Sequence, residues 1–258
     1  MTLTVCFDAL GTCFTLEQVT DAVDETFGDR LRAVGFGSKG FVMDWFHSCQ
    51  RDYTYLSLSS PPPPPIAKLL TTSLPIHLST ALNISPSSLP SLENITDRLS
   101  SLVPAPTLPE TFSHLHKKRA KLIIVTNGSK STTEGYASQA GIKGMVEKVL
   151  SCDDIGLAKP HKEVYEAALK AVGEVERGRE GERWFVAAHL WDLAAAKKAG
   201  FKTALVINDI PATALHGQDQ HLDAWYELYG GRPDLVGSSL LELAQGITED
   251  QARRLASV

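Results

Sequence analysis

The hydrophobic residues of this sequence gather in short runs that end in polar residues or glycine. The first run, TVCF at residues 4–7, leads directly into Asp8, Gly11 and Thr12. Short apolar runs of this kind, rich in β-branched and aromatic residues, predict buried strands. Further runs of the same type occupy residues 122–125, 148–152, 184–188 and 203–207.

Between these runs, apolar residues recur every three or four positions, which is the spacing of one face of an α-helix. Strands that alternate with helices in this way predict a parallel, doubly wound α/β sheet. The helices are expected at residues 110–118, 131–140, 163–172 and 193–199.

Residues 15–102 follow a different pattern. Leu16, Val19, Val23 and Phe27 fit one helix face, and no strand pattern is present. The run Pro61–Pro65 cannot form a helix or a central strand, so it predicts a stiff extended spacer. Further helices are expected at residues 41–58, 66–79 and 91–102.

The alternating pattern resumes after a proline-rich stretch, VPAPTLP, at residues 103–109. We therefore expect one α/β core built from residues 1–14 and 103–258. A helical cap, residues 15–102, would be inserted directly after the first strand.

Composition narrows the function classes. The 258 residues are 43% hydrophobic and carry a net charge of −5, which gives no electrostatic footprint for nucleic acid or anionic lipid. The four cysteines lack the spacing of a zinc site, and no apolar run approaches the ~20 residues that span a bilayer. We expect a cytoplasmic protein with a small-molecule substrate, no nucleic-acid or membrane partner, and a homodimer as the candidate assembly.

Polar residues stand at the ends of four predicted strands: Asp8, Thr126-Asn127, Lys159 and Asp192. In an open parallel sheet, the carboxyl ends of the strands line one crevice, so these side chains can converge. Asp8 would be the nucleophile or proton donor, and Lys159 would hold it ionised. Thr126 and Asn127 could bind a substrate oxygen, and Asp192 could anchor Lys159 or orient water.

Each of these residues alone is more often structural, because an aspartate after a strand commonly caps a helix. Their order along the chain, behind an inserted helical segment, makes the combination specific. The stretches FDALGT (7–12), VTNGS (125–129), AKPHKEVY (158–165) and VAAHLWDLAAA (186–196) carry this order.

Over essentially its whole length, the sequence resembles the haloacid dehalogenase superfamily and looks closest to the 2-haloacid dehalogenase branch. The resemblance implies that Asp8 attacks carbon and that water hydrolyses the resulting ester. The residues that would support Asp8 are those matching Thr12, Thr126, Asn127, Lys159, Tyr165 and Asp192. It also implies a helical cap after the first motif.

Two departures concern metal binding. Phosphatases of the superfamily carry an acid where this chain has Leu10, and a Mg²⁺ ligand where it has Ala188. Mg²⁺ requires several hard oxygen ligands, and Asp8 with Asp192 alone is a poor set. We therefore expect no metal and no other cofactor, and phosphoryl transfer is disfavoured.

Other departures concern the substrate. The dehalogenases have tyrosine at the position of Leu10, asparagine at that of His189, and a cap arginine that grips the halide. The arginine position falls on His47 or Phe46, with Arg51 one or two turns further along the helix. The pocket has thus exchanged a cation for histidines and apolar area, which suits a larger, less charged substrate. The expected substrate contacts are Leu10, Thr12, Trp45, Phe46, His47, Thr126, Asn127, Tyr165 and Trp191.

Three hypotheses remain. The first is a Mg²⁺-independent enzyme that uses Asp8 on an electrophilic carbon, by hydrolysis or by opening or rearranging an epoxide with a proton from His189 or His47. The second is a 2-haloacid dehalogenase proper with an unusual halide site. The third is a catalytically weak or non-catalytic binding protein of the same fold, against which the retained Asp8, Thr12, Lys159 and Asp192 argue. A phosphatase of the same fold is a further alternative.

Overall fold

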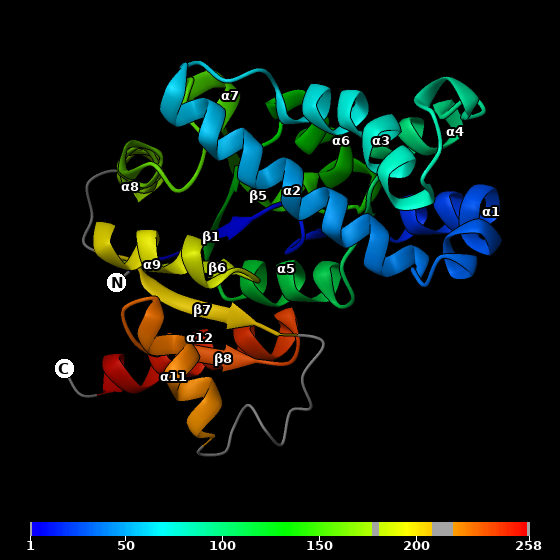
Figure 1. Cartoon of the computed structure of the whole chain (residues 1–258). Coiled ribbons are helices and arrows are strands. Elements are labelled where there is room, and N and C mark those ends of the chain that lie inside the picture. Colours follow the sequence, from blue (N-terminus) through cyan, green and yellow to red (C-terminus); the bar gives the residue numbers. More distant parts are fainter. Residues whose placement is uncertain (1, 177–180, 208–218, 257–258) are drawn as a thin grey trace.

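The computed structural model describes residues 2–176, 181–207 and 219–256 (Figure 1). Within these residues a six-stranded sheet has the order β5-β4-β1-β6-β7-β8, and every neighbouring pair is parallel. The predicted fold class, a parallel doubly wound α/β sheet, is confirmed. The strands are β1 (Thr2–Asp8), β4 (Lys121–Thr126), β5 (Val146–Ser151), β6 (Gly181–Ala187), β7 (Lys202–Val206) and β8 (Leu235–Gly237).

Strand β1 lies inside the sheet because it is apolar on both faces. Val5 and Phe7 pack into one hydrophobic cluster and Cys6 into the other, and all three are at most 1% exposed. A strand covered on both sides reads as a continuous apolar run, as this one does. Its last residue, Asp8, therefore reaches the carboxyl edge of the sheet.

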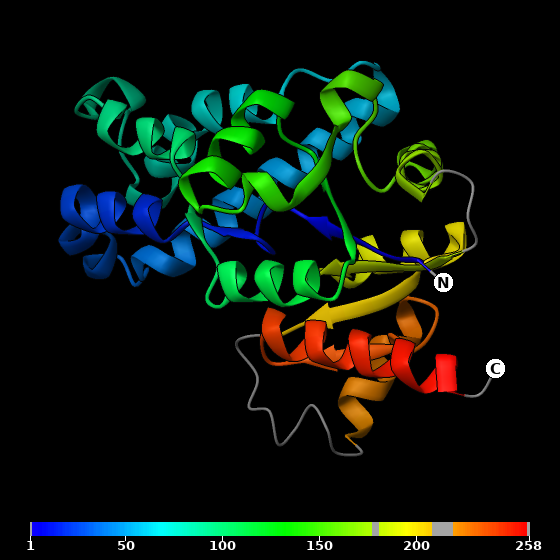
Figure 2. The ribbon, with the colours of Figure 1, turned by 180° about the vertical axis from the view of Figure 1, so that it is seen from behind.

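Helices cover both faces of the sheet. One cluster joins the face of Val5 and Phe7 to α5 (Leu108–Lys117), α6 (Lys130–Gln139) and α12 (Leu240–Ala256). Figure 2 shows α5 and α12 lying across this side. The opposite face packs against α8 (Lys162–Glu176), α9 (Leu190–Ala199) and α11 (Gln220–Leu228). Short helices α7 (Cys152–Ile155) and η3 (Lys143–Met145) flank β5.

The segment between β1 and α5 is mainly helical, and Figure 1 shows α1, α2 and α3 lying together beside the sheet. At its two ends, β2 (Phe14–Thr15) pairs antiparallel with β3 (Val103–Pro104). This two-residue pairing was not predicted, because so short a strand leaves no alternation in the sequence. The helices of the segment are α1 (Glu17–Ala33), α2 (Ser38–Ser59), α3 (Ile66–Leu82), η1 (Pro86–Ser88), α4 (Glu93–Thr96) and η2 (Asp97–Ser100).

Across the part of the chain that the structure describes, none of the helices combines the length and the apolar character needed to cross a bilayer.

The packing of α5 on β1 gives a stability prediction. Phe112 is fully buried, and its ring centroid lies 4.9 Å from that of Phe7. We expect Phe112→Ala to lower the free energy of unfolding by about 3–5 kcal/mol, because the cavity it leaves cannot fully collapse. Urea unfolding measures the loss. Leu58→Ala, at a side chain 65% exposed, is the control and should cost under about 1 kcal/mol; equal losses would contradict the packing described.

Candidate active site

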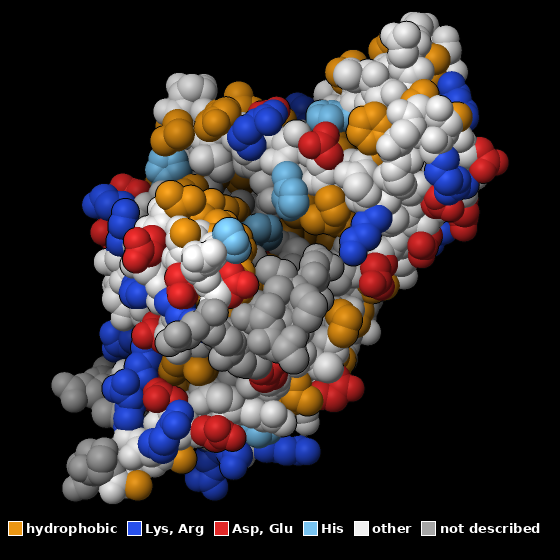
Figure 3. Space-filling model, turned by 60° about the horizontal axis from the view of Figure 1, so that its bottom comes forward, with side chains coloured by type: hydrophobic (Ala, Val, Ile, Leu, Met, Phe, Trp, Pro, Cys, Tyr) orange, Lys and Arg blue, Asp and Glu red, His pale blue; other side chains and the backbone are white. Residues whose placement is uncertain are grey.

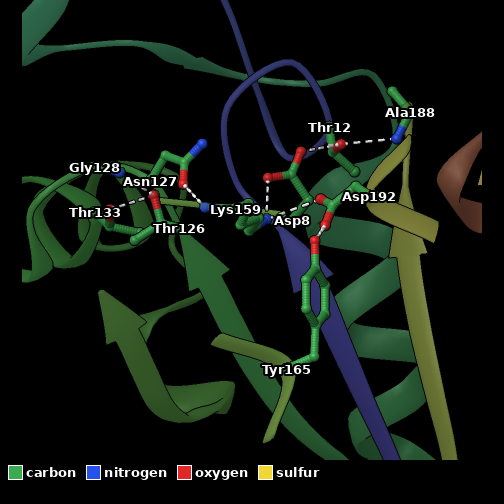
Figure 4. A network of polar contacts seen from close by, with 10 residues as sticks. All are labelled: Asp8, Thr12, Thr126, Asn127, Gly128, Thr133, Lys159, Tyr165, Ala188 and Asp192. Atoms are coloured by element: carbon green, nitrogen blue, oxygen red, sulfur yellow. Dashed lines mark hydrogen bonds and ion pairs between the residues drawn. The ribbon is translucent and has the colours of Figure 1, made fainter. Parts of the chain in front are cut away.

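Asp8 is held by hydrogen bonds to both carboxylate oxygens (Figure 4). The Lys159 ammonium donates to Oδ1 at 2.7 Å, and the Thr12 hydroxyl donates to Oδ2 at 2.6 Å. The Thr12 hydroxyl in turn accepts the backbone N–H of Ala188 at 2.9 Å. Thr12 was predicted to contact the substrate, but its hydroxyl is occupied in orienting Asp8.

The loop after β1 turns sharply through Gly11, whose φ is +83°. A Cβ at this position would lie 3.2 Å from Cε1 of His189. Only glycine combines this backbone conformation with so close a neighbour. The loop that carries Asp8 is therefore packed directly against the His189 ring.

Lys159 is completely buried between two carboxylates. Its Nζ lies 2.7 Å from Asp8 and 2.9 Å from Asp192, and its backbone N–H donates to Oδ1 of Asn127 at 3.0 Å. Burial lowers the lysine pKa, but Asp192 and Asp8 outweigh it and raise the pKa above its ordinary value. The side chain is therefore a fixed cation paired with both carboxylates.

Asp192 lies in the first turn of α9 and is also fully buried. One oxygen accepts from Lys159 and the other accepts the hydroxyl of Tyr165. Burial raises the pKa of Asp192 to about 6, and the Lys159 charge opposes this shift. Burial, together with Asp192, raises the pKa of Tyr165 well above its ordinary value. Tyr165 has no exposed surface and its hydroxyl bonds to Asp192, and its contact with a substrate stays a prediction.

The loop after β4 is held by its own side chains. Thr126 is completely buried, and its hydroxyl accepts the backbone N–H of Gly128 at 2.9 Å and the Thr133 hydroxyl at 3.4 Å. Asn127 uses its carbonyl oxygen to accept the backbone N–H of Lys159. The Thr126 hydroxyl therefore shapes the loop, whereas Asn127 keeps its amide NH₂ beside the Lys159 backbone. The contact of both residues with a substrate stays a prediction.

A cleft of about 680 Å³ opens beside the Asp8 loop. The His189 ring stacks on Trp191 with centroids 5.4 Å apart, and the His47 ring meets it edge-on at 6.0 Å. Figure 3 shows a face of the molecule on which histidine and hydrophobic side chains border a hollow. The cleft is lined by His47, Gln50, Arg51, Thr54, Tyr55, Pro160, His189, Trp191 and Tyr229.

Both histidines of this cleft have pKa values lowered below the ordinary histidine range. Burial lowers the pKa of His189, partly offset by Asp8, while Lys159 lowers it further. Burial and His189 lower the pKa of His47. Nδ1 of His189 is buried without a hydrogen-bond partner, so this imidazole retains hydrogen-bonding capacity.

Arg51 lies one turn beyond His47 on α2 and also lines the cleft. Its Nε is paired with Asp52 at 3.0 Å, and its side chain is 56% exposed. The wall next to Asp8 therefore presents His189 and His47, while the guanidinium lies further along α2 and is partly neutralised.

Leu10 and Phe46 line a separate, smaller apolar cavity of about 70 Å³, together with Leu16, Leu70 and Tyr136. Trp45, which precedes Phe46 on α2, does not line this cavity. It is fully buried, and its Nε1 donates to Ser73 on α3 at 3.1 Å. The ring packs α2 against α3, and the expected contact of Trp45 with substrate stays a prediction.

Three side chains fasten α2 to the segment around Lys159. The Thr54 hydroxyl donates to the carbonyl of Lys159 at 3.1 Å, and Ser57 accepts the N–H of Ala158 at 2.9 Å. The Tyr53 hydroxyl donates to Asp153 at 3.2 Å. The helix that carries His47 is thus fixed relative to the buried lysine.

The sequence also matches known proteins. The sequence profile of the haloacid dehalogenase-like hydrolases matches residues 2–200. This chain belongs to that family.

Named relatives of this haloacid dehalogenase-like hydrolase include two enzyme types. An (S)-2-haloacid dehalogenase of Pseudomonas sp. (strain YL) is 27% identical over 204 residues, covering 78% of this chain and 81% of the relative. The pyrophosphatase PpaX of Halalkalibacterium halodurans is 30% identical over 129 residues, covering 49% of this chain and 55% of the relative.

The fold has similar solved structures. The L-2-haloacid dehalogenase of Xanthobacter autotrophicus with chloropropionic acid covalently bound superposes with a TM-score of 0.67, at 23% identity, covering 95% of this chain and 98% of that one. At this identity, the similarity establishes the fold alone.

The Mg²⁺ of the family's phosphatases does not fit this donor set. The carboxylates of Asp8 and Asp192 already share the Lys159 ammonium, while Leu10 and Ala188 supply no side-chain oxygen. Over residues 2–176, 181–207 and 219–256, no group of three His, Cys, Asp or Glu side chains is placed to hold a metal ion. Two shared carboxylates fall short of the ligands that Mg²⁺ requires.

Several site residues were missed by sequence reasoning. They include the Ala188 N–H that orients Thr12, the Ser57 hydroxyl on α2, and Pro160 and Tyr229 in the cleft wall. Of these, Pro160 and Ala188 carried a signal, because they lie in the matched stretches 158–165 and 186–196. The others come from separate segments that only the fold brings together.

Proposed function

We propose that this haloacid dehalogenase-like hydrolase uses Asp8 as a nucleophile at an electrophilic carbon of a small to medium organic molecule, without a metal ion. The observation that carries the proposal is the Asp8 carboxylate itself. It is paired with the Lys159 ammonium, oriented by Thr12, and placed at the carboxyl edge of the sheet beside the cleft.

The reaction would proceed in two steps. A carboxylate oxygen of Asp8 attacks the carbon, and the leaving group departs with the bonding electrons. Water then attacks the carboxyl carbon of the ester and regenerates Asp8. Lys159, held by Asp192, neutralises Asp8 without forming a bond to the substrate.

A carbon–halogen bond is the first candidate for the bond that breaks. The relative from Pseudomonas is named for 2-haloacids, and the Xanthobacter enzyme carries chloropropionic acid as a covalent adduct. In this chain the halide would leave toward His47 and His189 rather than toward an arginine.

An epoxide carbon–oxygen bond is the second candidate, and the two imidazoles favour it. An uncharged imidazole is a weaker partner for halide than a guanidinium, but a protonated one can deliver a proton to oxygen. Opening the ring would place the new hydroxyl beside His189, with hydrolysis or rearrangement following.

We further propose that residues 15–102 act as a cap on a core formed by residues 1–14 and 103–258. The hydrogen bonds from Thr54 and Ser57 to the Lys159 segment support this role. They fix the helix that carries His47 over the reacting carboxylate.

The nucleophile can be tested by substitution and isotope labelling. We expect Asp8→Asn to lower kcat on (S)-2-chloropropionate or styrene oxide by at least about 10⁴-fold, because the amide is no nucleophile. With the unmodified enzyme in H₂¹⁸O, a single turnover should place ¹⁸O in the Asp8 carboxyl, read by peptide mass spectrometry. Label in the product alone would mean that water attacks carbon directly, and an active Asp8→Asn enzyme would refute the mechanism.

Metal independence can be tested by chelation. We expect EDTA treatment to leave turnover of the same substrates unchanged, because Leu10 and Ala188 provide no metal ligand. The pyrophosphatase relative supplies the opposing assay: release of phosphate from pyrophosphate with added Mg²⁺. Loss of activity with EDTA that Mg²⁺ restores, or efficient phosphate release, would overturn the proposal.

The leaving group can be identified with His189→Gln. If the enzyme opens epoxides with proton donation, this change should lower kcat by roughly 10²–10⁴-fold. The unmodified enzyme should lose this activity as pH rises through the lowered pKa of His189, since the donor must be charged. For halide release the loss should be small and mainly in KM. His77→Gln, on α3 outside the cleft, is the matched control.

A further inference from the structure

A second hollow of about 670 Å³ lies between α9 and the end of α11. It shares Pro160, Trp191 and Tyr229 with the cleft that holds His47 and His189. The two hollows have three wall residues in common and therefore lie next to each other. We call the second hollow the distal groove, and its wall includes Ala195, Ala199 and Leu228.

Two residues in the wall of the distal groove are sequence neighbours of the ion cluster around Asp8. Pro160 directly follows Lys159, and Trp191 directly precedes Asp192. Both neighbours belong to the buried ion cluster around Asp8. A molecule that occupies the cleft beside the Asp8 loop would therefore have the distal groove next to it.

The chemistry of the wall is mainly apolar. Ala195 and Ala199 on α9 have short side chains that leave the space open, and the apolar side chain of Leu228 is 81% exposed at its edge. Of the three charged lining residues, Lys162 pairs with Glu166 at 3.5 Å, and Lys198 is exposed. The wall thus has few groups to pair with a charged ligand, whereas its apolar side chains can contact a hydrocarbon.

We infer that the distal groove binds the hydrocarbon part of the substrate, so that the enzyme prefers substrates with a long alkyl or aryl group attached to the reacting carbon. This inference rests on the proposed function, because it places the reacting carbon at Asp8. A substrate as short as 2-chloropropionate has no atoms to reach beyond Trp191.

The test is a chain-length series of 2-bromobutanoate, 2-bromohexanoate, 2-bromooctanoate and 2-bromodecanoate, each kept below its micelle concentration. We expect kcat/KM to rise by up to about fourfold per added methylene, the value of burying one CH₂ group. A flat or falling series would overturn the inference.

Two variants locate the effect. Ala195→Phe fills the distal groove and should remove the gain for 2-bromodecanoate while leaving 2-bromobutanoate unchanged. Leu228→Ser, at an exposed site that tolerates substitution, should lower the rate on 2-bromodecanoate several-fold. Ala33→Phe, at an exposed alanine ending α1, adds the same bulk elsewhere and should change nothing. Equal losses for short and long substrates, or no loss, would overturn the inference.

A binding measurement separates this inference from the proposed function. Isothermal titration of the unmodified enzyme with decanoate and butanoate needs no turnover. Tighter binding of decanoate that Ala195→Phe abolishes would support the groove even if no bromoacid reacts, in which case only the proposed chemistry fails. Turnover without chain-length-dependent binding would leave the chemistry standing and refute the groove.

Discussion

The arrangement of this molecule depends on one buried cation. The Lys159 ammonium has no exposed surface and lies within 3 Å of both Asp8 and Asp192. A charge withdrawn from water is tolerated only when it is paired and hydrogen-bonded. Three segments distant in the sequence must therefore meet at one point. Tyr165, behind Asp192, fixes the far end of the cluster through its hydroxyl.

This constraint extends to the helical segment. The peptide groups of Ala158 and Lys159 bind Ser57 and Thr54 of α2, so fixing the lysine also fixes the helix that carries His47. His189 is placed by the same cluster, because it immediately precedes the α9 turn that contains Asp192. The imidazole-lined cleft and the groove beyond Trp191 thus follow from where one ammonium is buried.

Much of the fold could be predicted because its signals are local. The TVCF run is apolar on both faces, so it had to be an inner strand, and Asp8 had to lie at its carboxyl edge. Thr126, Asn127 and Asp192 could be placed at the same edge by the same reasoning. Trp45 marks the limit of this reasoning, because periodicity shows that a helix face is buried but not what covers it. In this chain α3 covers it through Ser73.

By itself, the sequence determined the strand–helix order, the parallel sheet and the residues at its carboxyl edge, because hydrophobic periodicity is set by neighbouring residues. Only the tertiary structure decided which polar groups form hydrogen bonds with one another. The Thr12 hydroxyl donates to Asp8, and the Thr126 hydroxyl accepts the backbone N–H of Gly128. The Tyr165 hydroxyl donates to Asp192. The closeness of His47 to His189 was likewise decided there. Hydrogen bonds and ring contacts depend on separations of a few ångströms between segments far apart in the chain, and no pattern along the chain records those distances.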